Sequence, residues 1–264
     1  MTDSRLPDLA VAGERIAVGE RRDLEVSAAR LPSGAMVAMP VTVLRGAETG
    51  PGFWLTAAVH GDEIIGTEVI RQVISRLDPV ALRGHVVAAP VVNVHGFAVG
   101  SRYLPDRRDL NRSFPGSSRG SLASRLARLV LDTCVEPCDL GIDLHTGSDN
   151  RTNLPQVRGD LDDRSTRNLA VVFGAPAMIL SQVRDGSPRG AAVRAGKTAL
   201  VFVGGEALRF DEVVIDVAVA GVMRALAHVG MIDGITPAAD TPFEAQESSW
   251  AVSYTHLTLP TKIV

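Results

Sequence analysis

His60 and Glu63 stand with two residues between them in the segment His60-Gly-Asp-Glu63, directly after a nearly unbroken apolar run at residues 53–59. An imidazole nitrogen and a carboxylate oxygen at this spacing can reach one cation from a single tight turn. A catalytic zinc site takes three such protein ligands and keeps one position open for water. The segment therefore predicts a metal site that needs a third ligand.

His145 is the candidate for that third ligand. It ends a second apolar segment, Leu140-Gly-Ile-Asp-Leu-His145, and a Thr-Gly turn follows it. A lone histidine at the end of a strand is more often hydrogen-bonded to a backbone carbonyl than bound to metal. Two of them, one beside a glutamate, favour the metal site. The remaining histidines lack this setting combined with an adjacent acid: His85, His95, His228 and His256.

Both apolar segments are expected to be strands that end at the same edge of a sheet. Residues 53–59 contain no charged side chain, as in a strand that is buried on both faces between parallel neighbours. Open α/β sheets bind their ligands at the carboxyl ends of the strands. This edge of the sheet is therefore where His60, Glu63 and His145 are expected to lie.

The rest of the chain alternates between strand and helix patterns. Residues 13–46 alternate on both sides of Pro32-Ser-Gly34, which predicts an antiparallel hairpin. Helices are expected at 64–77, 121–135, 162–174, 189–196 and 211–230, further strands at 84–92, 139–144, 177–181 and 198–203, and loops at 48–52, 93–120 and 146–160. This order predicts one domain over residues 1–250, a three-layer α/β/α sandwich with a mixed, mainly parallel sheet.

The composition is that of a globular protein with little net charge. The 264 residues are 45% hydrophobic and 22% charged, with a formal net charge of −3. There is no basic surplus for binding nucleic acid, and no stretch approaches the roughly 18 apolar residues of a membrane span. Because the first residues are polar and resemble no export signal, the protein is expected to be cytoplasmic, with Cys134 and Cys138 as free thiols.

Four arginines lie within eleven residues of a glycine- and proline-rich stretch. Such clusters are usually solvated charge runs. Here Leu110 and Phe114 flank Asn111 and Arg112 and are expected to anchor the loop. A fixed guanidinium can bind a carboxylate through two hydrogen bonds, so the sequence predicts a small anionic substrate. Arg102 could stabilise the oxyanion that forms when water attacks a carbonyl.

Three ordered motifs resemble the succinylglutamate desuccinylase/aspartoacylase family, which is itself similar to the zinc carboxypeptidases: His60-Gly-Asp-Glu63, Asp109-Leu-Asn-Arg-Ser-Phe-Pro-Gly116 and Asp143-Leu-His145-Thr-Gly. The resemblance covers about residues 10–250. It implies a zinc-carboxypeptidase-like fold and one zinc ion per chain, held by His60, Glu63 and His145. It also implies that Asn111 and Arg112 hold a substrate carboxylate and that Arg102 polarises the scissile carbonyl. The implied reaction is hydrolysis of a small N-acyl amino acid, or a related amide or ester, by zinc-activated water.

One position departs from the family pattern. Similar members carry Tyr-Glu-Gly-Gly-Glu-Ala-Leu-Arg-Phe-Asp-Glu, whose first glutamate is the general base, whereas this chain has Phe202-Val-Gly-Gly-Glu-Ala-Leu-Arg-Phe-Asp-Glu212. Val203 therefore occupies the base position and cannot accept a proton. Glu206 matches a different family position, and its offset past two glycines is expected to aim it elsewhere. Loss of a general base removes roughly 10²–10⁴ of rate, so slow hydrolysis is expected.

Three interpretations remain open. The chain could be a zinc-dependent deacylase, a zinc-bearing protein that binds an anionic ligand without turnover, or a metal-free structural relative. The first leads, because the metal-ligand and anion-binding motifs are all present. Val203 is the feature that favours the second over the first, unless a single-nucleotide sequence error has replaced a glutamate codon. Residues 251–264 resemble a translated sequencing adapter and are interpreted as a non-native tail, in place of the small β-rich C-terminal domain that caps the cleft in family members.

Overall fold

The structure is a computed structural model, and it describes residues 8–30, 34, 36–148, 151–183, 185–238 and 240–246. The interpretation of residues 251–264 as a non-native tail concerns residues outside these ranges. Within the described chain, no helix is both long enough and apolar enough to cross a membrane.

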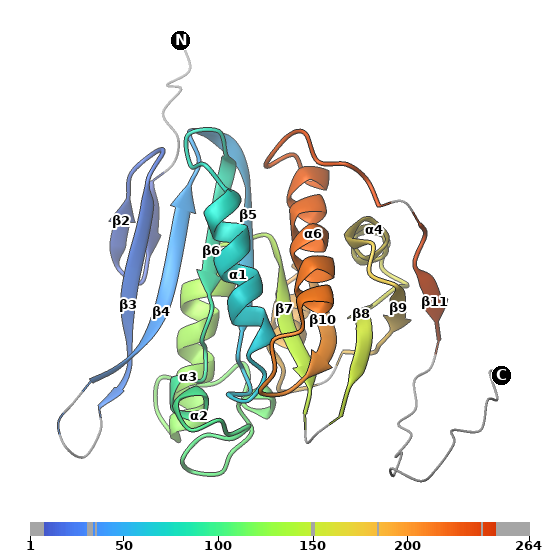
Figure 1. Cartoon of the computed structure of the whole chain (residues 1–264). Coiled ribbons are helices and arrows are strands. Elements are labelled where there is room, and N and C mark those ends of the chain that lie inside the picture. The colour runs from blue at the N-terminus through green and yellow to red at the C-terminus, as the bar shows by residue number, and fades with distance from the viewer. Residues whose placement is uncertain are drawn as a thin grey trace, which may run out of the picture.

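A nine-stranded sheet forms the centre of the described part of the chain (Figure 1). In spatial order its strands are β11 (Phe243–Ala245), β9 (Ala177–Leu180), β8 (Asn153–Gly159), β10 (Thr198–Glu206), β7 (Leu140–Gly147), β5 (Glu48–Ala57), β6 (Arg83–Ala89), β4 (Met36–Arg45) and β3 (Arg21–Arg30). Pairs β3–β4, β4–β6 and β8–β10 are antiparallel and the others are parallel, so the sheet is mixed and mainly parallel. The predicted hairpin is formed by β3 and β4, while β1 (Leu9–Val11) and β2 (Glu14–Ile16) make a separate small hairpin.

Helices cover both faces of this sheet. One face packs against α1 (Ile65–Arg76), α4 (Arg164–Phe173) and α6 (Glu212–His228), and the other packs against α3 (Leu122–Val130), its π-helical extension η2 (Leu131–Val135) and α5 (Pro188–Arg194) (Figure 1). Side chains of β5 alternate between the two cores, because Phe53 and Leu55 join the first and Trp54 the second. The three-layer α/β/α prediction is therefore confirmed.

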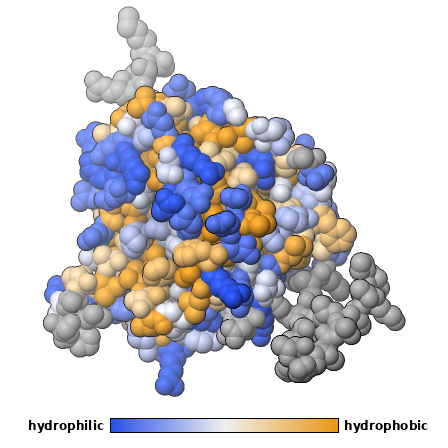
Figure 2. Space-filling view, viewed as in Figure 1, coloured by the Kyte–Doolittle hydropathy of each residue, from blue (hydrophilic) through white to orange (hydrophobic). Residues whose placement is uncertain are grey.

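The face that carries α1, α4 and α6 presents a mixed outer surface. Figure 2 shows hydrophilic and hydrophobic side chains interspersed over it. Most apolar residues of these helices turn inward, where Val69, Phe173 and Val222 are completely shielded from solvent, whereas Val171 and Val213 are exposed. The helices thus bury one stripe each against the sheet, as amphipathic helices of a layered domain do.

The loop expected at residues 48–52 is instead the first half of β5. Glu48 and Gly52 pair with Arg83 and His85 of β6. A Cβ atom at Gly50 would lie 2.6 Å from the carbonyl carbon of Arg83. The glycines here allow two strands to approach closely, a use that composition does not distinguish from a turn.

The loop expected at residues 146–160 contains β8. This strand pairs with β10 on one side and with β9 on the other. Gln156 and Arg158 project from one of its faces, while Val157 joins the apolar core on the opposite face. Because polar residues occupy positions that face a site rather than solvent, the strand lacks the apolar pattern that would have predicted it.

Candidate metal and substrate site

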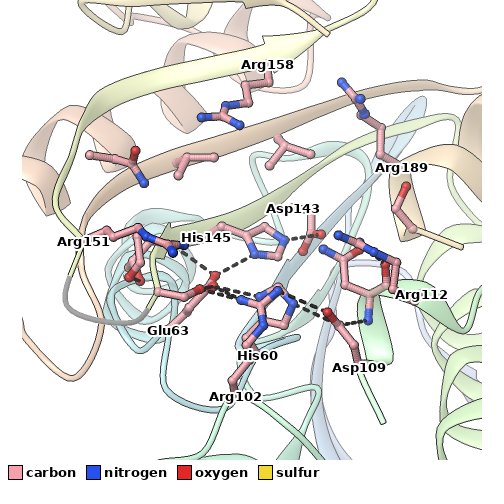
Figure 3. A pocket seen from close by; sticks show the side chains of 18 of the residues that line it. His60, Glu63, Arg102, Asp109, Arg112, Asp143, His145, Arg151, Arg158 and Arg189 are labelled. Carbon is pink, nitrogen blue, oxygen red and sulfur yellow. Dashed lines mark hydrogen bonds and ion pairs between the residues drawn. The ribbon is translucent and has the colours of Figure 1, made fainter. Parts of the chain in front are cut away.

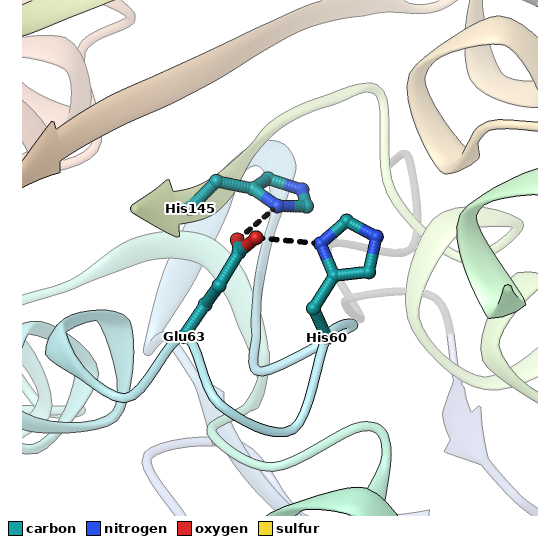
Figure 4. Close-up of side chains that lie close together, drawn as sticks. All are labelled: His60, Glu63 and His145. Atoms are coloured by element: carbon teal, nitrogen blue, oxygen red, sulfur yellow. Dashed lines mark hydrogen bonds and ion pairs between the residues drawn. The ribbon is translucent and has the colours of Figure 1, made fainter. Parts of the chain in front are cut away.

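The carboxyl ends of β5 and β7 bring the three predicted metal ligands together. These strands are parallel neighbours, with Thr56 opposite Asp143. His60 and Glu63 follow β5, and His145 lies near the end of β7. One potential ligand atom from each of the three residues lies within 4.8 Å of the others (Figure 4). Parallel pairing thus turns two sequence segments more than eighty residues apart into one cluster.

The turn that carries His60 and Glu63 requires glycine at position 61. A Cβ atom there would lie 2.1 Å from the carbonyl carbon of Gly96, in α2 (Val94–Ala98). The backbone N–H of Glu63 donates to the carbonyl oxygen of His60 at 3.1 Å and closes the turn. This local geometry aims both side chains at the same point.

Glu63 lies between the two imidazoles. Its Oε1 is 2.7 Å from Nδ1 of His60, and its Oε2 is 2.7 Å from Nδ1 of His145. All three residues are buried, with exposed fractions of 2% for Glu63, 3% for His60 and 7% for His145. Burial alone would raise the pKa of the Glu63 carboxyl, but the charges of His145 and His60 lower it well below its usual value.

A further carboxylate lies at the far nitrogen of each imidazole. Nε2 of His145 is 2.7 Å from Oδ2 of Asp143, and Nε2 of His60 is 3.2 Å from Oδ1 of Asp109. The hydroxyl of Thr56 donates to the other oxygen of Asp143 at 2.7 Å. Both aspartates belong to the family-like motifs, but no role was predicted for either of them. The two-residue spacing of Asp143 and His145 on one strand was the signal that could have found the first.

The donor set fits a divalent cation. When Nε2 of each histidine donates to its aspartate, the lone pair on Nδ1 faces the cluster, which is the arrangement that metal-binding histidines use. Burial lowers the pKa of His145, but Asp143 and Glu63 outweigh it and raise the pKa to about 10. The pKa of His60 is also raised, because Glu63 and Asp109 outweigh its burial. The surroundings therefore favour positive charge, and two nitrogens with one carboxylate form a donor set of catalytic zinc sites.

Arg102 closes one side of the cluster. Its Nη1 donates to Oε1 of Glu63 at 3.3 Å and to the hydroxyl of Ser148, and its Nη2 donates to Oδ2 of Asp109 at 3.2 Å. Ser148 in turn donates to Oε1 of Glu63 at 2.6 Å. Burial would raise the pKa of Asp109, but His60 and Arg102 hold it well below its usual range. A guanidinium is thus fixed beside the predicted metal ligands.

A cavity of about 380 Å³ opens onto the cluster. Figure 3 shows Arg158 and Arg189 on the side of the cavity opposite Glu63 and His60. Its lining includes five arginines: Arg102, Arg112, Arg151, Arg158 and Arg189. The described carboxylates that line it are Glu63, Asp109 and Asp143, and each is already bonded within the cluster. Such a lining suits an anionic ligand.

Asn111 and Arg112 both line this cavity. They lie in the short 3-10 helix η1 (Leu110–Arg112), where the side chain of Asp109 accepts a hydrogen bond from the backbone N–H of Asn111 at 2.8 Å. Leu110 and Phe114 are buried on either side, as the sequence analysis expected of anchors. The loop therefore holds both residues at the mouth of the predicted metal site.

Val203 and Glu206 occupy different surroundings. Val203 lies opposite His145 in the pairing of β10 with β7, lines the cavity, and is 7% exposed. Glu206 is not among the residues that line the cavity, and it forms an ion pair with Arg209 at 3.3 Å. A register shift at Gly204 and Gly205 separates the two positions. Glu206 therefore points away from the site, as its offset led us to expect.

Comparisons with known proteins agree with this geometry. Residues 49–229 match the family model described as the succinylglutamate desuccinylase/aspartoacylase catalytic domain. The N-alpha-acetyl-L-2,4-diaminobutyric acid deacetylase of Halomonas elongata is 31% identical over 215 residues, which cover 78% of this chain and 62% of that enzyme. The chain thus spans less than two thirds of the length of this curated relative.

Solved structures show the same relationship. A succinylglutamate desuccinylase/aspartoacylase from Rhodobacter sphaeroides is 29% identical with a TM-score of 0.76, over 82% of this chain and 67% of that one. The product-bound ectoine utilization protein EutE (DoeB) of Ruegeria pomeroyi is 25% identical with a TM-score of 0.78, over 87% of this chain and 72% of that one. The family expected from the three motifs is confirmed. The chain belongs to the succinylglutamate desuccinylase/aspartoacylase family, whose catalytic domain it carries in residues 49–229.

Proposed function

We propose that the chain is a zinc-dependent deacylase that hydrolyses the amide, or a related ester, of a small anionic N-acyl amino acid. The observation that carries this proposal is the buried His60–Glu63–His145 cluster at the base of a cavity lined by arginines. The family match and the name of the Halomonas elongata relative, a deacetylase of an acetylated amino acid, support the reaction class.

Each residue of the site would have a distinct task. His60, Glu63 and His145 would hold the zinc, which when bound would supply a Lewis acid that activates water and polarises the scissile carbonyl. Asp109 and Asp143 keep the two imidazoles in the orientation that binding needs.

Two further groups would act on the substrate. The guanidinium of Arg102 lies beside Glu63, where it would stabilise negative charge that develops on the carbonyl oxygen during attack by water. Asn111 and Arg112 would bind and orient a substrate carboxylate at the cavity wall. Together these contacts would fix the acyl carbon beside the His60–Glu63–His145 cluster.

Proton transfer is the step of hydrolysis for which the described residues of the cavity offer no free carboxylate. Hydrolysis requires a group that takes a proton from the attacking water and delivers one to the leaving amine. The described carboxylates in the cavity lining are bonded to histidine or arginine partners, and Val203 is apolar. We therefore expect slow turnover from the chain as it stands.

The same valine supports a second candidate function. A protein of this kind could bind zinc and an anionic ligand without hydrolysing it, because binding needs the cluster and the arginines but no proton acceptor. Purified protein incubated with a panel of N-acyl amino acids separates the two functions. Release of free amino acid above the rate in buffer supports the deacylase, and saturable binding without release supports the binding protein.

Replacing His145 with alanine is expected to remove zinc from the protein. The wild-type chain should contain one zinc ion per chain, and the variant should contain almost none, because two of the three ligands do not form a catalytic zinc site. Metal analysis after gel filtration measures both. His228→Ala is the matched control, since His228 is an exposed residue at the end of α6 and should leave zinc content unchanged. Equal zinc content in His145→Ala and the wild-type protein would exclude His145 as a ligand.

Replacing Arg112 with alanine is expected to weaken binding of an N-acyl amino acid by about 1.5–3 kcal/mol, the size of a hydrogen bond to a charged group. Isothermal calorimetry on the zinc-loaded protein measures this change. Arg119→Ala is the control, because Arg119 is exposed and does not line the cavity. Affinity that is equal for the wild-type protein and Arg112→Ala would rule out this contact.

A further inference from the structure

Gln156 is a buried polar side chain that the proposed mechanism does not use. It is 7% exposed, and its Oε1 is a buried atom with no hydrogen-bond partner. Burying an amide oxygen without a partner costs free energy, so most buried polar groups are bonded. The position of Gln156 in the middle of β8 therefore needs a physical reason.

The neighbours of Gln156 across the sheet explain the missing partner. Gln156 lies opposite Val203 of antiparallel β10 and opposite Ala177 of parallel β9. Residues directly opposite each other in a sheet project from the same face, so their side chains are in contact range. Neither valine nor alanine offers a polar side-chain atom. The amide therefore has an apolar neighbour on each side.

The same row of residues continues across β10 to His145, one of the three predicted metal ligands. Val203 is opposite Gln156 on one side and opposite His145 on the other. Gln156, Val203 and His145 thus form one rung across three adjacent strands, with the valine between the amide and the imidazole. A polar side chain at position 203 would lie between a hydrogen-bonding group and the predicted zinc ligand.

We propose that Gln156 is a positioning residue for a carboxylate at position 203, and that this chain keeps the partner while lacking the acid. The proposal rests on the proposed deacylase function, together with the general-base glutamate that the family resemblance implies at position 203. A glutamine suits both states of such a base, because its NH2 group donates to the ionised carboxylate and its Oε1 accepts from the protonated carboxyl. It would fix one carboxyl oxygen and leave the other directed at the cavity.

A purely structural role for Gln156 makes a different prediction. If Gln156 only fills space, replacing it with leucine can change stability differently beside valine and beside glutamate, because the two side chains are in contact range, but it should not lower kcat selectively. If it orients a carboxylate, the two positions should be coupled, because residues that share a hydrogen bond do not act independently. A double-mutant cycle of Gln156→Leu and Val203→Glu distinguishes these cases.

The cycle has two readouts on zinc-loaded protein. The first is thermal unfolding: Gln156→Leu should lower the Tm of the Val203→Glu protein but leave the Tm of the valine protein unchanged or raised, because there it removes an unpaired polar group. The second is kinetic: in the Val203→Glu protein, Gln156→Leu should lower kcat by roughly 10–100-fold with little change in KM, since a misplaced base slows only the chemical step. Gln72→Leu on α1, away from the site, is the control and should be additive.

Each outcome decides between the two ideas. Non-additive Tm values with a selective loss of kcat support the positioning role. Additive Tm values overturn it, even when Val203→Glu restores activity. If Val203→Glu brings no hydrolysis, the proposed general-base position fails, and the Tm cycle still decides whether Gln156 contacts a carboxylate at position 203.

Discussion

Replacing Glu63 with glutamine is expected to abolish zinc binding and to lower the free energy of unfolding of the metal-free protein by about 3–5 kcal/mol, the usual cost of removing one partner from a buried ion pair. The two carboxyl oxygens of Glu63 lie 2.7 Å from Nδ1 of His60 and of His145, and one of them also accepts from Arg102 at 3.3 Å. Glutamine keeps the shape of the glutamate side chain but replaces one carboxyl oxygen with an NH2 group. This NH2 group donates hydrogen bonds, so it would face one of these positively charged groups without being able to accept from it.

Two measurements test this expectation. Metal analysis gives the zinc content, and chemical denaturation of chelator-treated protein gives the free energy of unfolding. Glu136→Gln is the matched control, because Glu136 makes its ion pair with Arg128 at a largely exposed position and should contribute at most about 1 kcal/mol. Retention of a full zinc equivalent by Glu63→Gln would show that the carboxylate is not a ligand.

The convergence of His60, Glu63 and His145 was predictable from sequence because it depends on strong local signals. Apolar runs that stop at His60 and His145 predict buried strands, and buried strands of an α/β sheet end at a common edge. The glutamate two residues beyond Gly61 completed the donor set. No long-range contact had to be known, since this expectation needed only two strands that end at the same edge of the sheet. The direct pairing of β5 with β7 is known from the structure.

The rest of the cavity was not predictable in the same way. Arg158 and Arg189 come from β8 and α5, and nothing in the sequence places them beside residues of the 101–116 segment. Strand β8 escaped detection because its site-facing positions are polar, so it has no apolar run, and because Pro155 within it argues against a strand. Side chains that meet only through sheet order, such as Gln156 and Val203, require the register of three strands to be known.

Position 203 combines a departure from the family pattern with a place in the cavity wall. The sequence has a valine where the family resemblance implies a glutamate, and the structure places that valine in the cavity, opposite His145. Its surroundings do not supply a substitute among the described residues, because Glu206 is paired with Arg209 outside the cavity. The position therefore decides between slow hydrolysis and binding alone.

Replacing Val203 with glutamate is expected to raise kcat for an N-acyl amino acid by roughly 10²–10⁴-fold, the usual contribution of a general base, with zinc content unchanged. The substitution adds a carboxylate on the face of β10 that borders the cavity beside His145. We therefore expect this carboxylate to reach the attacking water while His60, Glu63 and His145 keep their positions. Steady-state kinetics and metal analysis on the same preparations measure both effects. Val201→Glu is the matched control, because it adds the same charge to the same face and the same cavity but two residues earlier on the strand, opposite Asp143. A base must lie within roughly 2.6–3.2 Å of the proton it takes, so this control should gain no activity.

Two outcomes would contradict the expectation. If the valine protein already hydrolyses the substrate fast and Val203→Glu adds nothing, the general base lies elsewhere, and Glu206 is the next residue to replace. If the wild-type protein and both variants are inert, a zinc-bearing binding protein is favoured.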